Sequence, residues 1–151
     1  MPINSSNNMP TSSLSRFLEA QNKRFAGYQQ ALTEIKNGYK SGHWIWYIFP
    51  QMKDLGYSSM SRFYGITSLK EAEEYMKNET LSGRLREITA ALLEHADKRA
   101  EDILGYVDAM KVKSSMTLFD AVCPGDVFEK VLVQFYGGER CGRTLRMIEG
   151  G

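Results

Sequence analysis

The chain has 151 residues, which is within the usual size of one compact domain with a buried core. Hydrophobic residues make up 42% of it and charged residues 25%, shares that are typical of globular proteins and argue against extensive disorder. Because 19 basic residues face 18 acidic ones, the formal net charge of +1 argues against broad nucleic-acid binding.

Cysteine, apolar and N-terminal patterns exclude several further classes. Cys123 and Cys141 lack the spacing of a disulfide framework, and two cysteines with two scattered histidines do not resemble a structural zinc site. No segment reaches the roughly 20 apolar residues of a membrane span, and the polar N-terminus lacks the core of a secretory signal. We therefore expect a cytoplasmic protein with no metal, cofactor or membrane contact, built as a disordered tail (1–12) and a single helical domain (13–149).

The first periodic stretch runs from Leu14 to Tyr39, where hydrophobic residues recur three and four positions apart. This spacing predicts one long helix, or two helices with a break near Gln21–Arg24, ending close to Gly38. The same stripe could form a coiled-coil seam with a partner or a second copy. Packing on the chain's own core is favoured, because only about three heptads are present.

Residues 41–51 form the most distinctive block of the sequence, Ser-Gly-His-Trp-Ile-Trp-Tyr-Ile-Phe-Pro-Gln. The unbroken apolar run from Trp44 to Phe49 predicts either a buried strand or a short buried helix, and periodicity does not separate the two. Pro50 ends either element, because the residue before a proline is disfavoured in helical dihedrals.

Further helices are predicted from amphipathic spacing, capping residues and glycine or proline stops. They cover Ser58–Tyr64, Leu69–Lys77 after a capping box of Thr67 or Ser68 with Glu71, Leu81–His95, Glu101–Leu104, Val112–Cys123, residues 127–135 after Asp126, and a turn at Thr144–Met147. No repeat or alternating strand pattern is visible. The sequence thus predicts an all-α, single compact domain of about seven or eight helices, several of them short.

Several motifs besides the 41–51 block are long and specific. They are Arg16-Phe17-x-x-Ala20-Gln21, Tyr64-x-Ile66-x-Ser68-Leu69-x-Glu71-Ala72, Leu81-x-x-Arg84-Leu85 and Lys111-x-Lys113-Ser114-Ser115-Met116-Thr117-Leu118-Phe119. Together they resemble a bacterial and fungal family catalogued as domain of unknown function 1810, whose members are sometimes mislabelled calpastatin. The resemblance spans nearly the whole domain and implies a compact helical fold without an established activity. It also implies an aspartate before the C-terminal Thr144–Leu145 pair, where this chain has Cys141.

His43 is the strongest candidate for chemistry, because an imidazole titrates near neutral pH and here precedes two tryptophans. It could act as a general acid or base, or donate to a phosphate or carboxylate; alternatively, it caps the Trp44 element through backbone contacts. Ser41, Trp44 and Gln51 are the other predicted ligand contacts of the block, Trp44 by stacking. A hydrogen bond to the local turn is an equal alternative for Gln51.

The second candidate cluster contains Lys111, Lys113, Ser114 and Ser115. We expect it at a helix start, where free backbone N–H groups, cations and hydroxyls make an anion site. The alternative is an ordinary serine cap with solvated lysines. Asp108 and Asp120, which flank the cluster, could pair with a lysine or orient His43, but ordinary surface charge is the favoured interpretation.

The segment from Gly137 to Arg143 is rich in glycine and arginine. It could wrap a phosphate, although a plain loop is the favoured interpretation of such a short pattern. Cys141 lies within it, and its basic neighbours suggest a lowered thiol pKa.

Two functional hypotheses follow. In the first, a small anionic or nucleotide-like ligand binds between the 41–51 block and the Lys111–Thr117 helix start, with His43 as proton donor or acceptor in hydrolase or transferase chemistry. In the second, the aromatic block is only core and the chain is a non-enzymatic interaction module, in which a homodimer is one alternative. Whether His43 and the Lys111–Ser115 cluster are adjacent distinguishes them.

Overall fold

The structure is a computed structural model that describes residues 14–150, so the tail predicted at residues 1–12 lies outside it. Within this range the domain is all-α, as predicted, and its β pairing is limited to one isolated parallel bridge between Met52 and Ile66. The helices are α1 (Ser15–Gln21), α2 (Tyr28–Asn37), α3 (Ile45–Ile48), the 3₁₀ helix η3 (Lys53–Leu55), α4 (Ser59–Tyr64), α5 (Leu69–Lys77), α6 (Glu79–Leu93), α7 (Ala100–Leu104), α8 (Tyr106–Val122), α9 (Val127–Tyr136) and α10 (Gly142–Gly150).

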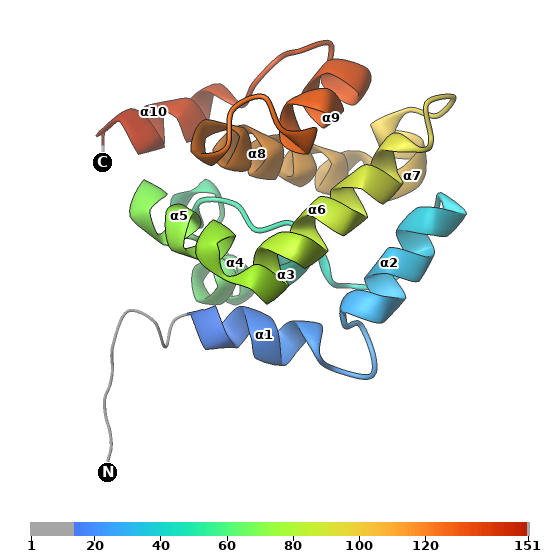
Figure 1. Cartoon of the computed structure of the whole chain (residues 1–151), viewed down its shortest axis with the longest axis horizontal. Helices are drawn as coiled ribbons and strands as arrows, with labels where there is room; N and C mark the ends of the chain where they lie inside the picture. The colour runs from blue at the N-terminus through green and yellow to red at the C-terminus, as the bar shows by residue number, and fades with distance from the viewer. Residues whose placement is uncertain (1–13, 151) are drawn as a thin grey trace.

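The two long helices, α6 and α8, organise the packing. Helix α8 packs against α5, α7, α9 and α10, while α6 packs against α2, α5 and α9. Figure 1 shows α6 crossing the molecule diagonally, with α8, α9 and α10 above it and α1 below. Their facing side chains make one continuous core, in which the largest fully buried residues are aromatic and aliphatic. The second half of α8 is therefore surrounded by other helices and is buried on nearly every face.

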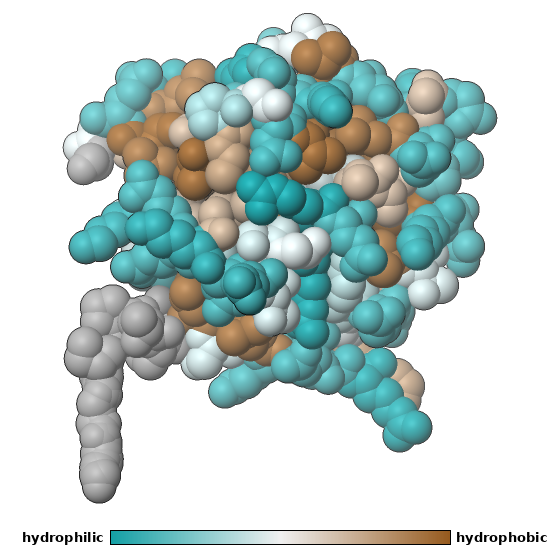
Figure 2. All heavy atoms as spheres, in the orientation of Figure 1, coloured by the Kyte–Doolittle hydropathy of each residue, from teal (hydrophilic) through white to brown (hydrophobic). Residues whose placement is uncertain are grey.

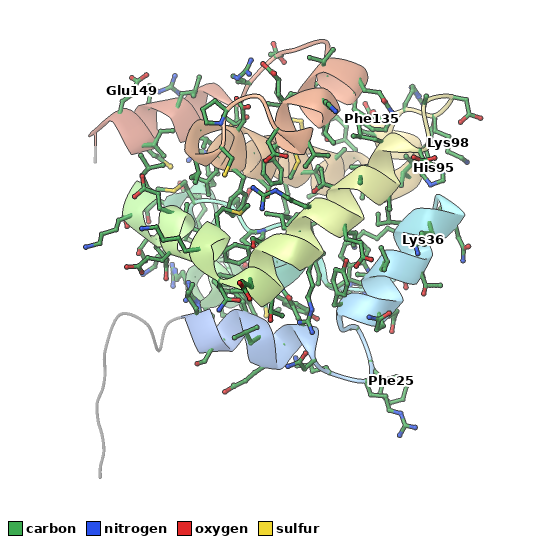
Figure 3. The ribbon with its side chains drawn as sticks, in the orientation of Figure 1. Phe25, Lys36, His95, Lys98, Phe135 and Glu149 are labelled. Atoms are coloured by element: carbon green, nitrogen blue, oxygen red, sulfur yellow. The ribbon has the colours of Figure 1, made fainter. Side chains whose placement is uncertain are left out.

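The Leu14–Tyr39 stripe is divided into two helices, which confirms the two-helix alternative. Ala26 has a positive φ of 57°, and a Cβ on Gly27 would lie 2.1 Å from the Lys23 carbonyl oxygen, so the chain turns here. Phe25 is 79% exposed and points away from the body of the protein (Figure 3). Since Tyr39 is exposed too, the stripe does not present one continuous apolar seam to a partner.

The C-terminal end of α2 is joined to that of α6. Gly38 adopts the left-handed conformation and ends α2, as predicted. The imidazole Nε2 of His95 lies 2.6 Å from the Ile35 carbonyl oxygen, and a Cβ on Gly38 would lie 3.1 Å from the same ring. Figure 3 shows His95 and Lys98 together at this junction, with Lys36 lower on α2. His95, which lies two residues beyond the end of α6, therefore ties two helices together.

Helix α8 begins at Tyr106, six residues earlier than the predicted Val112. Gly105, at φ 82°, separates it from α7. The first turn carries Tyr106 and Val107 with their side chains exposed, so the apolar pattern there does not mark a buried face. Ten α-helices are present in residues 14–150, above the predicted seven or eight, because the first stripe is divided and the Trp44 element is a helix.

The surface is chemically mixed. On the face drawn in Figure 2, hydrophobic side chains lie in separate groups divided by hydrophilic ones. No helix of residues 14–150 has both the length and the apolar character needed to cross a membrane.

Candidate functional site

The 41–51 block is anchored on the carboxylate of Glu34 in α2. One oxygen, Glu34 Oε1, accepts hydrogen bonds from the backbone N–H groups of Ser41 (2.8 Å) and Gly42 (2.9 Å) and from Trp44 Nε1 (2.9 Å). The Trp44 side chain is 0% exposed. Its predicted role as a stacking wall is therefore wrong, because the ring has no face open to a ligand.

The electrostatics of Glu34 fit this structural role. Burial alone would raise the pKa of the carboxyl group, but hydrogen bonds from Gly42, Ser41, Trp44 and Gln30 lower it to about 2. The carboxylate is therefore ionised at neutral pH and its first oxygen is fully occupied by donors. Glu34 holds the start of the block in place, which leaves it unsuited to bind an additional group.

Lys111 meets the block at the Trp46 ring, and it shares the carboxylate of Asp108 with Lys40, the residue just before the block. Asp108 accepts from Lys40 Nζ at 2.7 Å and from Lys111 Nζ at 3.1 Å. The Lys40 ammonium also lies 4.9 Å from the Trp44 ring centre, and the Lys111 ammonium 4.4 Å from that of Trp46. Burial would raise the pKa of Asp108, but the two lysines lower it. Asp108 is therefore an internal ion-pair centre, which corrects its interpretation as surface charge.

The remaining predicted residues of the block differ in their exposure and in their contacts. His43 is exposed, and within residues 14–150 neither of its ring nitrogens has a hydrogen-bond partner, so no side chain orients it. Ser41 is exposed, with its backbone N–H directed to Glu34. Gln51 is buried, and its backbone carbonyl accepts the Ile66 N–H at 2.9 Å.

The Lys111–Ser115 cluster lies inside α8, and its predicted placement at a helix start is wrong. Interior backbone N–H groups of an α-helix are bonded to carbonyl groups four residues earlier, so they are not free to bind an anion. The side chains also diverge. Ser114 Oγ lies 3.4 Å from Cys141 Sγ, whereas Ser115 is fully buried and its hydroxyl has no hydrogen-bond partner among the residues described.

Lys113 and Ser114 instead open onto a depression of about 320 Å³ between α8 and α10, called here the α8–α10 depression. Its lining comprises Met110, Lys113, Ser114, Glu139, Arg140, Cys141, Gly142, Arg143 and Arg146. Four of these side chains are cationic and one is acidic. Two of the cations are ion-paired, since Lys113 contacts Glu139 and Arg140 Nη2 lies 2.9 Å from Asp120 Oδ2.

The other two cations, Arg143 and Arg146, have no carboxylate partner within residues 14–150. Arg143 Nη2 makes a long hydrogen bond of 3.4 Å to the Asp54 carbonyl. Arg146 folds back towards the start of α10, where its Nη1 would lie 3.3 Å from a Cβ placed on Gly142. Two guanidinium groups in the first half of α10 therefore have no carboxylate partner among the described residues.

Cys141 is the residue immediately before α10 and lines the depression. Its backbone N–H donates to Thr117 Oγ1 at 3.0 Å, which fixes the residue against α8. Burial would raise the pKa of the thiol, but hydrogen bonds from Ser114, from the Thr144 hydroxyl and N–H, and from the Arg143 N–H lower it. The lowered thiol pKa suggested by the sequence is thus confirmed, although hydrogen bonds, rather than neighbouring cations, cause it.

A comparison with known protein families identifies the family of this chain. A family model described as "Protein of unknown function (DUF1810)" matches residues 11–148. The chain belongs to this family. The family resemblance drawn from the sequence is thereby confirmed.

A solved structure is also similar to this DUF1810 chain. The conserved hypothetical protein Rv1873 from Mycobacterium tuberculosis is 37% identical to it, with a TM-score of 0.83 over 91% of this chain and 96% of the other. No curated protein matches this DUF1810 chain.

Cys141 is the position at which the family resemblance implies an aspartate. At the start of a helix, aspartate accepts backbone N–H groups of the first turn. The N–H groups of Arg143 and Thr144 lie on the side of the Cys141 sulfur and help to lower the pKa of its thiol. In this DUF1810 chain the residue before α10 is a cysteine, and its sulfur lines the α8–α10 depression.

Sequence reasoning singled out neither Glu34, Lys40 nor Arg146. Glu34 and Lys40 carry no local signal, because their partners lie on other elements or many residues away. Arg146 follows Gly142 by four residues, a spacing that places both on one face of a helix and could have directed attention to it. Among residues 14–150, no three His, Cys, Asp or Glu side chains are grouped as a metal site requires.

Proposed function

We propose that this domain binds a small anionic ligand, carrying a phosphate or carboxylate group, in the α8–α10 depression. The observation that carries the proposal is the imbalance of charge in its lining. Four cationic side chains face one carboxylate, and two of the four, Arg143 and Arg146, are not ion-paired within the described part of the chain. Guanidinium groups match phosphate and carboxylate oxygens through paired hydrogen bonds, so an anion there would gain two donor groups at once.

Polar groups near the depression support the same ligand class. Ser114 supplies a hydroxyl from α8, and Arg143 lies in the first turn of α10, where backbone N–H groups carry partial positive charge. Lys113 is held by the exposed Glu139, a partner that an incoming anion can displace with little loss. The depression therefore combines fixed donors with one exchangeable cation.

The proposal keeps the ligand class expected from the sequence and changes its location. The 41–51 block is packed on Glu34, and Lys111 is paired with Asp108, so neither offers an uncompensated donor. Lys113 and Ser114 are the two predicted contacts that line the depression. Hydrolase or transferase chemistry depended on an oriented His43, which this arrangement does not supply, and the proposal is therefore one of binding.

Thermal-shift titration at low ionic strength tests the proposal, with inorganic phosphate, nucleotides, ADP-ribose and sugar phosphates as probes. At 100 times its Kd, a ligand stabilises the folded state by about 2.7 kcal/mol, which is an easily measured shift. We expect at least one probe to stabilise the wild type. The Arg143→Gln/Arg146→Gln variant should lose this effect.

The matched control is Lys36→Gln/Lys98→Gln, which removes the same charge from exposed side chains that do not line the depression (Figure 3). It should keep the full shift. If every probe leaves the wild type unchanged, or if both double variants lose the shift equally, the domain has no anion site at this position.

A further inference from the structure

We propose that Cys141 undergoes thiol–disulfide exchange with small anionic disulfides, so that the α8–α10 depression is a site of mixed-disulfide formation. This inference rests on the proposed function, because the cations that would hold an anion also receive the negatively charged disulfide. It adds the chemical class of the ligand and a covalent step. The alternative fates of the thiol, as an inert cap or as an unselective surface thiol, are outcomes of the test.

The sulfur is placed where a disulfide can reach it. Cys141 is partly exposed and lines the depression, together with Ser114 on the α8 side and Arg143 and Arg146 on the α10 side. Its backbone N–H is fixed by Thr117 Oγ1 at 3.0 Å, and its carbonyl accepts the Leu145 N–H at 3.1 Å. The position of the nucleophile is therefore set by two helices and does not depend on a flexible loop.

A buried hydroxyl group next to the sulfur is otherwise unused. Thr144 is 0% exposed, and among the residues described its Oγ1 has no conventional hydrogen-bond partner. Ser114 Oγ lies 3.4 Å from Cys141 Sγ and 3.2 Å from the Met110 carbonyl oxygen. Burial raises the pKa of the Cys141 thiol, but contacts with Ser114, Thr144 and Arg143 lower it. The surroundings of the sulfur therefore favour the thiolate more than those of an ordinary cysteine do.

The exchange step is balanced without any further reactant. The Cys141 thiolate attacks one sulfur of the disulfide, a new S–S bond forms, and the original S–S bond breaks. The departing sulfur leaves as a thiolate with the bonding electron pair, so it is reduced while the Cys141 sulfur is oxidised. The proton of the Cys141 thiol is lost to solvent before the attack, and the lowered thiol pKa favours this ionisation.

Charges around the thiol select among disulfides. Lys113 faces it from α8, Glu139 and Arg140 from the preceding loop, and Arg143 and Arg146 from α10. This set attracts a disulfide that bears carboxylates, stabilises the departing thiolate and repels a disulfide that bears ammonium groups. Cys123 offers a comparison within the same chain, since it is also partly exposed but lies 3.7 Å from one guanidinium, that of Arg86.

The test compares Cys123→Ser, which keeps Cys141, with Cys141→Ser, which keeps Cys123. Each is incubated with oxidised glutathione, which is anionic, or with cystamine, which is cationic, and mixed disulfide is counted by intact-mass spectrometry. At pH 7 we expect Cys141 to react with oxidised glutathione about tenfold faster than Cys123 does. The ratio of the glutathione rate to the cystamine rate should also be higher at Cys141, and should fall to the Cys123 value in Arg143→Gln/Arg146→Gln.

Two adjacent serines test the contribution of the hydroxyl beside the sulfur separately from that of the arginine charges. Ser114→Ala removes the hydroxyl bonded to the sulfur and should slow exchange at Cys141 at pH 7, while Ser115→Ala, inside the core, should leave it unchanged. Equal rates at the two cysteines, or a Cys141 that favours cystamine, would overturn the inference. Phosphate binding is measured separately, by thermal shift on Cys123→Ser, the same protein in which exchange at Cys141 is followed. If phosphate stabilises this protein while exchange is slow, only the inference fails. If phosphate does not stabilise it while exchange is fast and selective, only the proposed function fails.

Discussion

The two sides of α8 use similar residues for opposite purposes. On one side Lys111 joins Lys40 around Asp108, and both ammonium groups lie over tryptophan rings. On the other side Lys113 belongs to a depression in which Arg143 and Arg146 have no carboxylate partner within residues 14–150. In the first arrangement both ammonium groups contact the same carboxylate, and these contacts stabilise the fold. In the second, two guanidinium groups have no carboxylate contact within the described residues, and a bound anion would supply one.

The difference shows that a conspicuous sequence block need not be the binding site. The aromatic residues of 41–51 are conspicuous because a large buried indole, a partly buried carboxylate and an ion-pair network constrain several positions at once. The segment before α10 is short and rich in glycine, yet it brings guanidinium groups and a thiol together. Four predictions test this contrast, in order of decreasing expected effect.

Asp108→Asn should have the largest effect on stability. It leaves the Lys40 and Lys111 ammonium groups, whose side chains are only 8% and 19% exposed, without their shared carboxylate. Removing one partner of a partly buried ion pair leaves an uncompensated charge, so we expect a loss of about 3 kcal/mol. Urea denaturation measures it. Asp97→Asn, at an exposed position, is the control and should change stability by less than about 0.5 kcal/mol; an equal effect in the two variants would contradict the network.

Glu34→Gln should cost about 2 kcal/mol at pH 7, because three N–H donors lose a charged acceptor. The folded-state pKa of Glu34, about 2, is below its unfolded value of about 4.3. Its contribution is therefore complete above about pH 4.3 and is lost as the pH falls towards 2. Urea denaturation of both proteins across this range should show their difference shrinking with acid, and a constant difference would count against ionisation as the cause. Glu73→Gln, which is exposed, is the matched control.

Cys141→Ala should cost about 1 kcal/mol, as expected when the cap of a helix is removed. Cys141→Asp should keep the wild-type stability, since a carboxylate accepts the same N–H groups of the first turn of α10. The lowered thiol pKa gives the direction with pH: the advantage of wild type over Cys141→Ala is fully present above the unfolded thiol pKa and decreases as the pH falls through the folded value. Thermal unfolding of the three proteins between neutral and alkaline pH measures this. If alanine and aspartate are equivalent, the sulfur does not cap α10.

The fold was largely predictable because its signals are local. Gly38, Ser68 and Asp126 end or cap helices as their sequence context predicts, and apolar spacing locates most of the helices. The start of α8 was missed because Tyr106 and Val107 present apolar side chains to solvent. The site was less predictable, since the direction of each side chain in α8 depends on which helix packs beside it. Ser114 and Ser115 are adjacent in sequence, yet one meets Cys141 and the other lies in the core.

His43→Ala should have the smallest effect, although His43 was the strongest candidate in the sequence. The ring is exposed and makes no side-chain hydrogen bond within residues 14–150, so its removal should change the free energy of unfolding by less than about 0.5 kcal/mol. It should also leave the phosphate-induced thermal shift intact, because His43 does not line the α8–α10 depression. The informative comparison is with Arg143→Gln/Arg146→Gln in the same titration. If His43→Ala loses the shift and the arginine variant keeps it, the anion binds beside the aromatic block, and the contrast between the two sides of α8 is reversed.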